Sequence, residues 1–497
     1  MQEADVRAET TGRTGPGGEG GPARRVLVIG GGIAGLAAAH RLLAAGARVT
    51  VLEASGRLGG KLYAGELAGR PVDLGAESML ARRPEAVALA REVGLGDALQ
   101  PPATATATLW TRGALRRMPA GHVMGVPGDL APLAASGVLT DAGLRRTAED
   151  AELPATEVGE DVAVGAYVAA RLGREVVDRL VEPLLGGVYA GDAYRISMRA
   201  AVPKLFEAVR THRSLGESVR EIQRAAAASP QAAGPVFQGI DGGIGRLPQA
   251  VADACRAAGA DLRTGTAVSE LLRTPGGWRA VTASGEVLDA DAVVLATPAG
   301  PAAALLGSHA PAAAAELRTV EYASMALVTM AFRRSELPAA LTGPGAGSGF
   351  LVPPVDGRTI KASTFSSNKW GWVDRDDSEL FLLRTSVGRH RDEADLSRPD
   401  AELVGASLAD LGEAVGLAAR PVASTVTRWD GGLPQYPVGH LAAVARIRSA
   451  VSALPGLAVC GALYDGVGIP AVIGSARTAA DAILGTLAKS TDSDTGQ

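Results

Sequence analysis

The sequence predicts an α/β protein with a Rossmann-like dinucleotide-binding domain, discontinuous in sequence, together with a mixed-sheet substrate domain and a helical insertion. Three observations lead to this prediction. A strand at residues 26–29, a glycine turn, a helix from about residue 36 to 45 and a strand at residues 49–52 form an opening βαβ unit. Residues 80–224 have apolar side chains at intervals of three and four, which is typical of helices. Sheet-forming segments return in the middle of the chain and at its end, so the first domain is built from separate pieces.

The composition is that of a folded, globular protein. Of the 497 residues, 47% are hydrophobic and 21% are charged. The 49 Lys and Arg residues and the 53 Asp and Glu residues give a net charge of -4, whereas a protein that neutralises many phosphates normally has a basic excess. The sequence therefore disfavours nucleic-acid binding. Cys255 and Cys460 cannot form a disulfide framework or a Cys-rich zinc site, and they suit a reducing compartment.

No segment of the sequence predicts a transmembrane helix. The longest uncharged stretch, residues 292–315, is interrupted by prolines and a histidine. Arg24 and Arg25 precede an apolar run and resemble a twin-arginine signal, but the same run fits a strand, a glycine turn and a helix better. We therefore expect a cytoplasmic protein, and we expect residues 1–22 to form a disordered leader because they lack periodicity.

A glycine motif marks a dinucleotide site. Gly30, Gly32 and Gly35 form G-x-G-x-x-G between the first predicted strand and the helix. The first glycine permits the tight turn, the second lets the backbone approach a pyrophosphate, and the third lets helix and strand pack closely. The helix N-terminus favours the phosphates. Glu53 follows the second strand, where a carboxylate can hold both ribose hydroxyls, and this order favours a nucleotide site over a glycine-rich packing turn.

The residues after Glu53 indicate which dinucleotide is bound. The run Glu53-Ala54-Ser55-Gly56-Arg57-Leu58-Gly59-Gly60-Lys61 contains an E-A-x-x-R-x-G-G signature. This signature resembles that of the flavin-dependent amine oxidase superfamily, which includes monoamine oxidases, phytoene desaturases and protoporphyrinogen oxidases. The resemblance implies non-covalently bound FAD, with Arg57 and the Gly59-Gly60 pair beside the diphosphate and ribityl chain. It also implies that Cys460 is a buried structural cysteine rather than a covalent flavin attachment.

Further blocks resemble one branch of the superfamily, the porphyrinogen oxidases. They are VDLGAESMLARR, MPAGHVMGVP, LVEPLLGGVYAGDAYRISMRAAVPKL, LPQYPVGH and YDGVGIPAVIGSA, in the family's order, and the matches run from about Val26 to Leu484. The Met-Gly-Val-Pro and Leu-Ala-Arg-Arg steps look most like the soluble Gram-positive-type enzymes, which oxidise coproporphyrinogen III to coproporphyrin III. Membrane-bound homologues use protoporphyrinogen IX. One departure is Gly75-Ala76, where relatives often have Gly-Pro.

The resemblance implies FAD contacts that are spread over the chain. Val268 lies on a predicted strand that can offer backbone groups to the adenine, and the helix after Ile469 can stabilise negative charge on the reduced flavin. The alternative for Trp429 is ordinary core packing. The full set comprises Gly30, Gly31, Gly32, Ile33, Ala34, Gly35, Glu53, Ala54, Arg57, Gly60, Lys61, Gly75, Ala76, Glu77, Ser78, Val268, Trp429, Val467, Gly468 and Ile469.

The implied substrate bears four propionates, so its pocket needs basic groups at the rim and apolar walls around the macrocycle. Arg82 and Arg83 follow the flavin-facing loop and are candidates for propionate binding. The alternative for this pair is a solvated helix start. Gly349, Phe350 and Leu351 resemble the strand that lies against the macrocycle in the family, and the alternative for them is a core strand.

The implied chemistry is the removal of six hydrogens from the porphyrinogen in three two-electron steps, with reduced FAD reoxidised by molecular oxygen to hydrogen peroxide. The flavin does the chemistry, so we expect no catalytic side chain. The protein must place a bridge carbon about 3–3.5 Å from the reactive flavin nitrogen. The histidines show no metal-ligand spacing, and we expect no metal.

Three alternatives remain open from the sequence. Protoporphyrinogen IX could be the main substrate, or the chain could be another oxidase or desaturase of the superfamily, acting on amines or carotenoids. The third alternative is a flavoprotein that binds porphyrin without oxidising it and hands it to a chelatase. A transient contact with a chelatase is also compatible with the enzymatic reading.

These segments predict a division of the chain into domains. Short strands rich in β-branched and aromatic residues are expected from residue 321 to 384. The FAD-binding domain comprises residues 24–87, 236–310 and 425–488; residues 88–224 form a mainly helical and substrate-domain insertion; and residues 311–424 form the substrate-binding domain.

Overall fold

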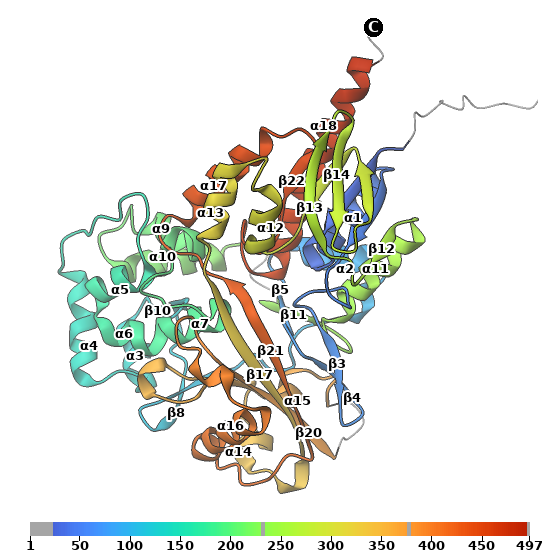
Figure 1. Ribbon diagram of the computed structural model, residues 1–497. Helices are drawn as coiled ribbons and strands as arrows, with labels where there is room; N and C mark the ends of the chain where they lie inside the picture. The colour runs from blue at the N-terminus through green and yellow to red at the C-terminus, as the bar shows by residue number, and fades with distance from the viewer. Residues whose placement is uncertain (1–22, 230–233, 375–378, 495–497) are drawn as a thin grey trace, which may run out of the picture.

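The computed structural model describes residues 23–229, 234–374 and 379–494. Residues 1–22, where the sequence predicts a leader, lie outside the described residues. A five-stranded parallel sheet carries the nucleotide-binding half, and its strands come from the start, the middle and the end of the chain (Figure 1). In spatial order they are β12 (Asp261–Arg263), β2 (Arg48–Leu52), β1 (Arg25–Ile29), β16 (Ala292–Leu295) and β22 (Leu457–Val459).

Helices cover both faces of this sheet because its strands are apolar on both sides. Val26 and Val28 belong to the core on one face, and Leu27 and Ile29 belong to the core on the other. The first face packs against α1 (Ile33–Ala44), α2 (Pro84–Glu92), α11 (Arg246–Ala257) and α18 (Ile469–Asp494). The second face packs against α12 (Ala299–Leu306), α13 (Pro311–Arg318), α17 (His440–Ser452) and a small antiparallel sheet of β13 (Val268–Thr274), β14 (Gly277–Thr282) and β15 (Val287–Ala290).

A seven-stranded mixed sheet forms the other half. All neighbouring strands are antiparallel except the parallel pair β18 and β7. The strands expected from residue 321 to 384 are present, but β17 has 12 residues and is not short. In spatial order the sheet contains β21 (Ala423–Pro434), β17 (Tyr322–Arg333), β20 (Leu380–Val387), β19 (Ile360–Thr364), β18 (Gly349–Leu351), β7 (Ala107–Thr111) and β8 (Ala114–Arg117).

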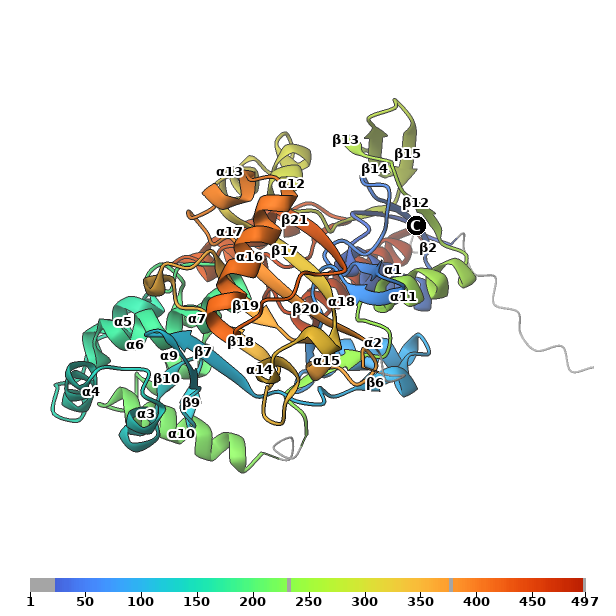
Figure 2. The same ribbon diagram turned by 90° about the horizontal axis from the view of Figure 1, so that it is seen from below.

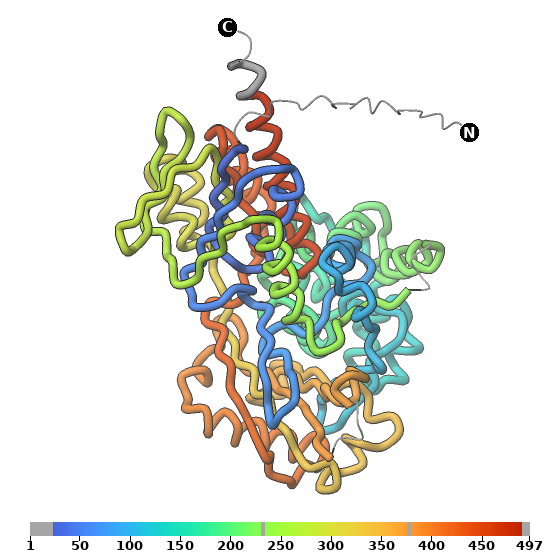
Figure 3. The backbone as a smooth tube through the Cα atoms, turned by 90° about the vertical axis from the view of Figure 1, so that its right-hand side faces the viewer, coloured from blue at the N-terminus to red at the C-terminus, as the bar shows by residue number. Residues whose placement is uncertain are grey.

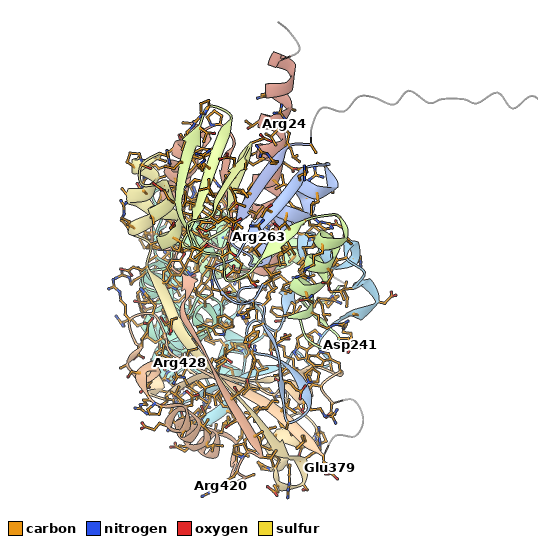
Figure 4. All side chains as sticks on the ribbon, turned by 45° about the vertical axis from the view of Figure 1, so that its right-hand side comes forward. Arg24, Asp241, Arg263, Glu379, Arg420 and Arg428 are labelled. Atoms are coloured by element: carbon orange, nitrogen blue, oxygen red, sulfur yellow. The ribbon has the colours of Figure 1, made fainter. Side chains whose placement is uncertain are left out.

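One face of this sheet is closed by α16 (Asp400–Val415), whose Leu403 and Leu411 are fully buried against it. The short helices α14 (Ala339–Thr342) and α15 (Ser366–Lys369) lie in its connections. Figure 4 shows Arg420 and Glu379 at the end of the molecule farthest from the nucleotide-binding half, and Arg263 within that half, where it ends β12.

The helical insertion lies beside the seven-stranded sheet (Figure 2). It has its own apolar core, which includes Leu180, Leu205 and Phe206. Its helices are α3 (Leu130–Ser136), α4 (Asp141–Ala148), α5 (Val164–Leu172), α6 (Arg174–Val176), a π-helical segment (Val177–Val181), α7 (Glu182–Tyr189), α8 (Met198–Ala201), α9 (Pro203–Ala208) and α10 (Leu215–Ala227).

Short strands join the parts. Figure 3 shows that chain segments from the start, the middle and the end run together in the nucleotide-binding half. The remaining strands are β3 (Ala64–Leu67), β4 (Arg70–Asp73), β5 (Met79–Leu80), β6 (Leu99–Gln100), β9 (His122–Val123), β10 (Val126–Pro127) and β11 (Phe237–Ile240).

The predicted fold class is confirmed, because a parallel nucleotide-type sheet, a mixed sheet and a helical insertion are all present. The division into domains stays a prediction. The expected boundary between residues 424 and 425 falls inside β21, and α13 packs on the nucleotide-binding half. Across the described residues, none of the helices combines the length and the apolar character needed to cross a membrane.

A buried ion pair stabilises the helical insertion. The Arg171 guanidinium is fully buried and donates from Nε to Asp150 Oδ1 at 2.7 Å. Asp150 Oδ2 in turn accepts from Ser214 Oγ at 2.8 Å. These contacts join α5 to the start of α10.

We expect Asp150→Ala to lower the free energy of unfolding by about 3–5 kcal/mol, because it leaves the Arg171 charge buried and unpaired. Chemical denaturation followed by circular dichroism measures the change. Asp289→Ala is the matched control, since its partner Arg279 is solvent-exposed, and the control should unfold like the unsubstituted protein. Equal unfolding curves for the two variants would contradict the prediction.

Candidate functional site

The glycine turn between β1 and α1 is built on close backbone contacts. Gly30 has a φ of +109°, and a Cβ on it would lie 2.7 Å from the carbonyl oxygen of Ala296, which directly follows β16. A Cβ on Gly35 would lie 1.8 Å from the carbonyl oxygen of Gly30. Side chains at these two positions would force β1, β16 and α1 apart. The first and third glycines of the motif therefore serve the packing of the fold.

The second glycine of the motif faces open space instead. Gly32 is the N-cap of α1 and provides no side-chain cap to the helix. The nearest atom to a Cβ on Gly32 would be Gly60 Cα, at 3.9 Å. Gly31 O accepts from Gly59 N at 2.9 Å, which holds the two glycine segments side by side. The result is a cradle between Gly32 and Gly60 that a side chain would fill, with the free N–H groups of a helix start at its edge. These features fit a dinucleotide diphosphate.

Glu53 holds the glycine turn from the end of β2. Its Oε2 accepts from Gly31 N at 2.7 Å, and its Oε1 accepts from Ser55 N at 2.8 Å. The segment that leads to Val268 runs beside it, because Thr266 N donates to Glu53 O at 2.8 Å. Each carboxylate oxygen has a further lone pair. The Glu53 carboxylate can therefore still accept hydrogen bonds from a ribose. Its contact with the ribose and the contact of Val268 with adenine stay predictions, and the structure brings Glu53 beside the segment that leads to Val268.

The loop of residues 75–78 meets the far end of the same site. A Cβ on Gly75 would lie 2.1 Å from Lys61 O, so loop and cradle are in backbone contact. Trp429 on β21 donates from Nε1 to Leu74 O at 3.0 Å. The Arg57 guanidinium lies 4.0 Å from the centre of the Tyr63 ring and 5.7 Å from that of Trp429. Residues far apart in the sequence that were predicted to contact FAD thus lie together.

Glu77 is buried and ties this loop to the seven-stranded sheet. Its carboxylate forms ion pairs with Lys369 Nζ and, at 3.1 Å, with Arg384 Nε. Arg384 also donates to Gly75 O at 2.8 Å. Burial raises the pKa of Glu77, but the charges of Arg384 and Lys369 outweigh it and leave the pKa below its ordinary value. The side chain of Glu77 therefore positions the loop.

Asp73, on the strand before this loop, differs from Glu77. Burial raises its pKa to about 6, although Gly245 N and Ile244 N donate to its carboxylate at 2.9 and 3.0 Å. The amine of Lys61 is also poorly solvated, and this burial lowers its pKa. No described residue forms a salt bridge with Lys61, so its amine is available to a ligand.

The final glycine loop lies between the nucleotide half and the helical insertion. α18 begins at Ile469, and Val472 N donates to Gly468 O at 3.0 Å in its first turn. Val467 packs against the core of the helical insertion, as does Leu351 of β18. Cys460, just before this loop, is fully buried, which agrees with the structural role expected for it.

The predicted substrate residues are separated by the fold. Phe350 points into the core under α16, whereas Leu351 lies on the opposite face of β18. Arg82 is exposed, and the guanidinium of Arg83 pairs with Glu85 at 2.5 Å at the start of α2. Binding of propionate by this arginine pair and contact of Gly349 to Leu351 with the macrocycle stay predictions. Leu351 is the residue of that strand that faces the site.

Sequence reasoning missed three groups beside the site. His440 stacks on Tyr436, with ring centres 3.9 Å apart. Lys361 and Arg389 are buried cations near Leu351. His440 is the first residue of α17 and ends the block LPQYPVGH, which gave no role for it, whereas no motif marks Lys361 in β19 or Arg389 in the turn after β20. Among the described residues, no cluster of His, Cys, Asp and Glu side chains is suited to a metal ion.

Comparisons with known proteins agree with this geometry. The family described as flavin containing amine oxidoreductase matches residues 33–484. The coproporphyrinogen III oxidase of Mycobacterium tuberculosis is 38% identical over 469 residues, which cover 93% of this chain and 98% of that protein. The coproporphyrinogen III oxidase of Bacillus subtilis is 31% identical, with 92% and 97% covered.

A solved structure from an Exiguobacterium species, provisionally assigned as a protoporphyrinogen oxidase, is also similar. Its TM-score is 0.81 at 32% identity, and the likeness covers 93% of this chain and 99% of that one. The bovine protoporphyrinogen oxidase is 30% identical over 505 residues, which cover 93% of this chain and 99% of that protein.

The open cradle predicts that one glycine substitution removes the cofactor and spares the fold. Gly32→Ala should fold normally, since nothing lies within 3.9 Å of the new Cβ, but should bind FAD about tenfold more weakly or worse. Gly35→Ala should lose folded protein, because its Cβ meets Gly30 O. Flavin absorbance per chain and the thermal unfolding midpoint measure the two effects. Full FAD content in Gly32→Ala would contradict the prediction.

His440 predicts a pH dependence of stability. Burial lowers its pKa to about 4 in the folded protein, from 6.5 when exposed. The unfolded chain therefore binds more protons between these values, and stability is full above pH 6.5 and falls as the pH drops. We expect a loss of about 2 kcal/mol from this residue between pH 7 and pH 5.

His440→Phe keeps an aromatic ring against Tyr436 and removes the titration. Denaturant unfolding of both proteins at pH 7 and pH 5 isolates the histidine, because Asp73 and other groups titrate in both. An identical pH dependence in the two proteins would show that His440 remains protonatable in the fold.

Proposed function

Because the chain belongs to the flavin-containing amine oxidoreductase family, we propose that it oxidises coproporphyrinogen III to coproporphyrin III in haem biosynthesis. The chain is an oxidoreductase and its cofactor is FAD. The observation that carries the proposal is the likeness to coproporphyrinogen III oxidases over nearly the whole of both chains. The arrangement of the cradle, the loop of residues 75–78 and the final glycine loop supports it.

When bound, FAD supplies a two-electron acceptor for the reduced tetrapyrrole. Conversion of one porphyrinogen to porphyrin removes six hydrogens, which three O2 molecules accept to form three H2O2. The residues of the chain would bind the cofactor and orient the substrate. The cradle between Gly32 and Gly60 would hold the diphosphate, and Glu53 would hold the ribose.

The ends of the cradle would position the reacting ring. Gly75 and Trp429 would lie at one side of the flavin ring, and Val467 would lie at the other. Leu351, which packs with Val467 against the core of the helical insertion, would provide an apolar wall for the substrate. Formation of an aromatic porphyrin provides the driving force for the reaction. The protein therefore has mainly to orient the substrate against the cofactor. Proton loss from the pyrroles needs no dedicated base in this scheme.

Protoporphyrinogen IX is the second candidate substrate, because the bovine protoporphyrinogen oxidase is 30% identical to this chain. Both porphyrinogens share the macrocycle that this site would orient. A passing contact with a chelatase that takes up the product also belongs to the proposal. The two free cysteines are buried, which is compatible with the proposed cytoplasmic location.

The proposed function predicts that the purified yellow protein loses its oxidised flavin absorbance when coproporphyrinogen III is added without oxygen. Readmission of air should restore the oxidised flavin band and allow turnover. Porphyrin, measured by its fluorescence, and hydrogen peroxide should then form in a molar ratio of one to three. Gly32→Ala, purified and assayed without added FAD, is the control for autoxidation, since it should retain much less of the cofactor.

The same assay with protoporphyrinogen IX separates the two substrates. A higher kcat/KM for coproporphyrinogen III supports the proposal, and a higher value for protoporphyrinogen IX favours the second candidate. A flavin band that neither substrate bleaches would overturn porphyrinogen oxidation.

A further inference from the structure

Two buried cations lie next to each other at one end of the seven-stranded sheet. Lys361 in β19 is 6% exposed, and its Nζ donates to Gly388 O at 2.6 Å. Arg389, just after β20, is 9% exposed, and its Nη2 donates to Val352 O at 3.1 Å. Both of these hydrogen bonds end on backbone carbonyls. Within the described residues, neither cation takes part in a salt bridge.

Burying these two positive charges side by side costs free energy unless an anion binds between them. Burial and, second to it, the neighbouring charge of Arg389 together lower the pKa of Lys361 to about 7. Burial also lowers the pKa of Arg389, while Asp392 and Glu182 partly compensate. Glu182 is a weak counterion, because burial raises its pKa to about 7. Two desolvated like charges without a paired carboxylate are typical of a site for an anionic ligand.

The register of the sheet places these cations beside the candidate site. Leu351, Ala362, Ser386 and Leu327 are consecutive partners across β18, β19, β20 and β17. We call these four residues the inner row. They lie on the face opposite α16, and Leu351, Ala362 and Ser386 are only half-buried. The two side chains in the middle of the row, Ala362 and Ser386, are small.

The inner row crosses the sheet between the loop of residues 75–78 and the cations. On one side of the row, Arg384 lies two residues before Ser386 along β20 and donates to Gly75 O. On the other side, Lys361 precedes Ala362 at a bulge in β19. The acceptor of Arg389, Val352 O, follows Leu351 directly. From residue 384 to residue 388 the chain covers roughly 13 Å. A tetrapyrrole with extended side chains is of this order of length.

Helix α7 closes the space above the cations. It packs on β18 and β19, as Figure 2 shows, and Gly187 faces the Leu351 side chain. His390 N donates to Ala190 O at 2.6 Å, which fixes the turn that contains Arg389 against the end of α7. His390 and Arg391 also line a hollow of about 440 Å³ with Glu321, Tyr322 and Glu393. That hollow adjoins the cations and contains none of the predicted FAD residues.

We propose that Lys361 and Arg389 form a subsite for a propionate carboxylate of the tetrapyrrole, on the side of the inner row opposite the loop of residues 75–78. The subsite rests on the proposed function, since it takes a porphyrinogen as the ligand above the inner row. A carboxylate between the two cations supplies the charge that the protein does not provide. It orients the macrocycle so that the opposite edge meets the flavin-facing loop.

The test uses the FAD-loaded protein and the fluorescent product coproporphyrin III. Lys361→Met and Arg389→Gln should each weaken binding of coproporphyrin III at least tenfold. Binding of its tetramethyl ester, which has no carboxylates, should change less than twofold in the same variants. Lys204→Met, which removes an exposed lysine from α9, is the matched control and should bind both ligands like the unsubstituted chain.

Unfolding measurements separate binding from a structural role. The thermal midpoint of Lys361→Met should equal or exceed that of the unsubstituted protein, because the substitution removes an unpaired buried charge. Coproporphyrin III should raise the midpoint of the unsubstituted protein more than that of the variant. A lower midpoint with equal losses for acid and ester would mean that Lys361 only supports the fold, and the proposal would be wrong.

Kinetics distinguish failure of the subsite from failure of the proposed function. If coproporphyrinogen III reduces the flavin of the unsubstituted protein and of Lys361→Met with the same KM, the function stands and the subsite is overturned. If coproporphyrin III binds with the expected pattern but coproporphyrinogen III reduces no flavin, the subsite stands and the function is overturned. An unsubstituted protein that prefers the ester to the acid would also overturn the subsite.

Discussion

Close contact between backbones at the carboxyl ends of β1 and β16, two inner strands of the parallel sheet, is the constraint on which this structure depends. Gly35 lies against the carbonyl of Gly30, and Gly30 lies against the carbonyl of Ala296, so β1, α1 and β16 meet without side chains between them. This contact directs the N-terminus of α1 toward the cradle between Gly32 and Gly60. Glu53 then holds the turn through Gly31 N. A site for a dinucleotide diphosphate follows from packing that no residue with a Cβ allows.

A second constraint joins the nucleotide half to the seven-stranded sheet. Glu77 is buried in the loop of residues 75–78, and its charge is balanced by Lys369 and Arg384 from the other half. Because a buried carboxylate without such partners is costly, loop and sheet fix each other's position. The same arginine donates to Gly75 O, so the flavin-facing backbone and the inner row share one anchor. The family's redox chemistry requires this kind of fixed distance between cofactor and substrate.

Local signals in the sequence predicted the parts of the site that lie close together along the chain. The glycine turn, the helix and Glu53 need only short-range geometry, and all three are present, although α1 begins at Ile33, three residues earlier than expected. Predictions that depended on the partner of a strand were less complete. Phe350 and Leu351 are neighbours in sequence, yet the alternation of side chains along β18 sends one into the core under α16 and the other toward the helical insertion. The length of β17 was also missed, because long-range pairing extends a strand beyond its local pattern.

The sequence by itself determined the fold class, the family and the cofactor, since these are encoded in glycine spacing and in blocks of contiguous residues. Only the tertiary structure decided which charges are buried and which side chains share a face. Lys361 and Arg389 are brought together by the bulge in β19 and by the turn after β20, and Glu77 meets Arg384 from a different sheet. The reason is physical: the cost of a charge depends on the water and the partners around it, and both are set by segments that lie far away in the chain.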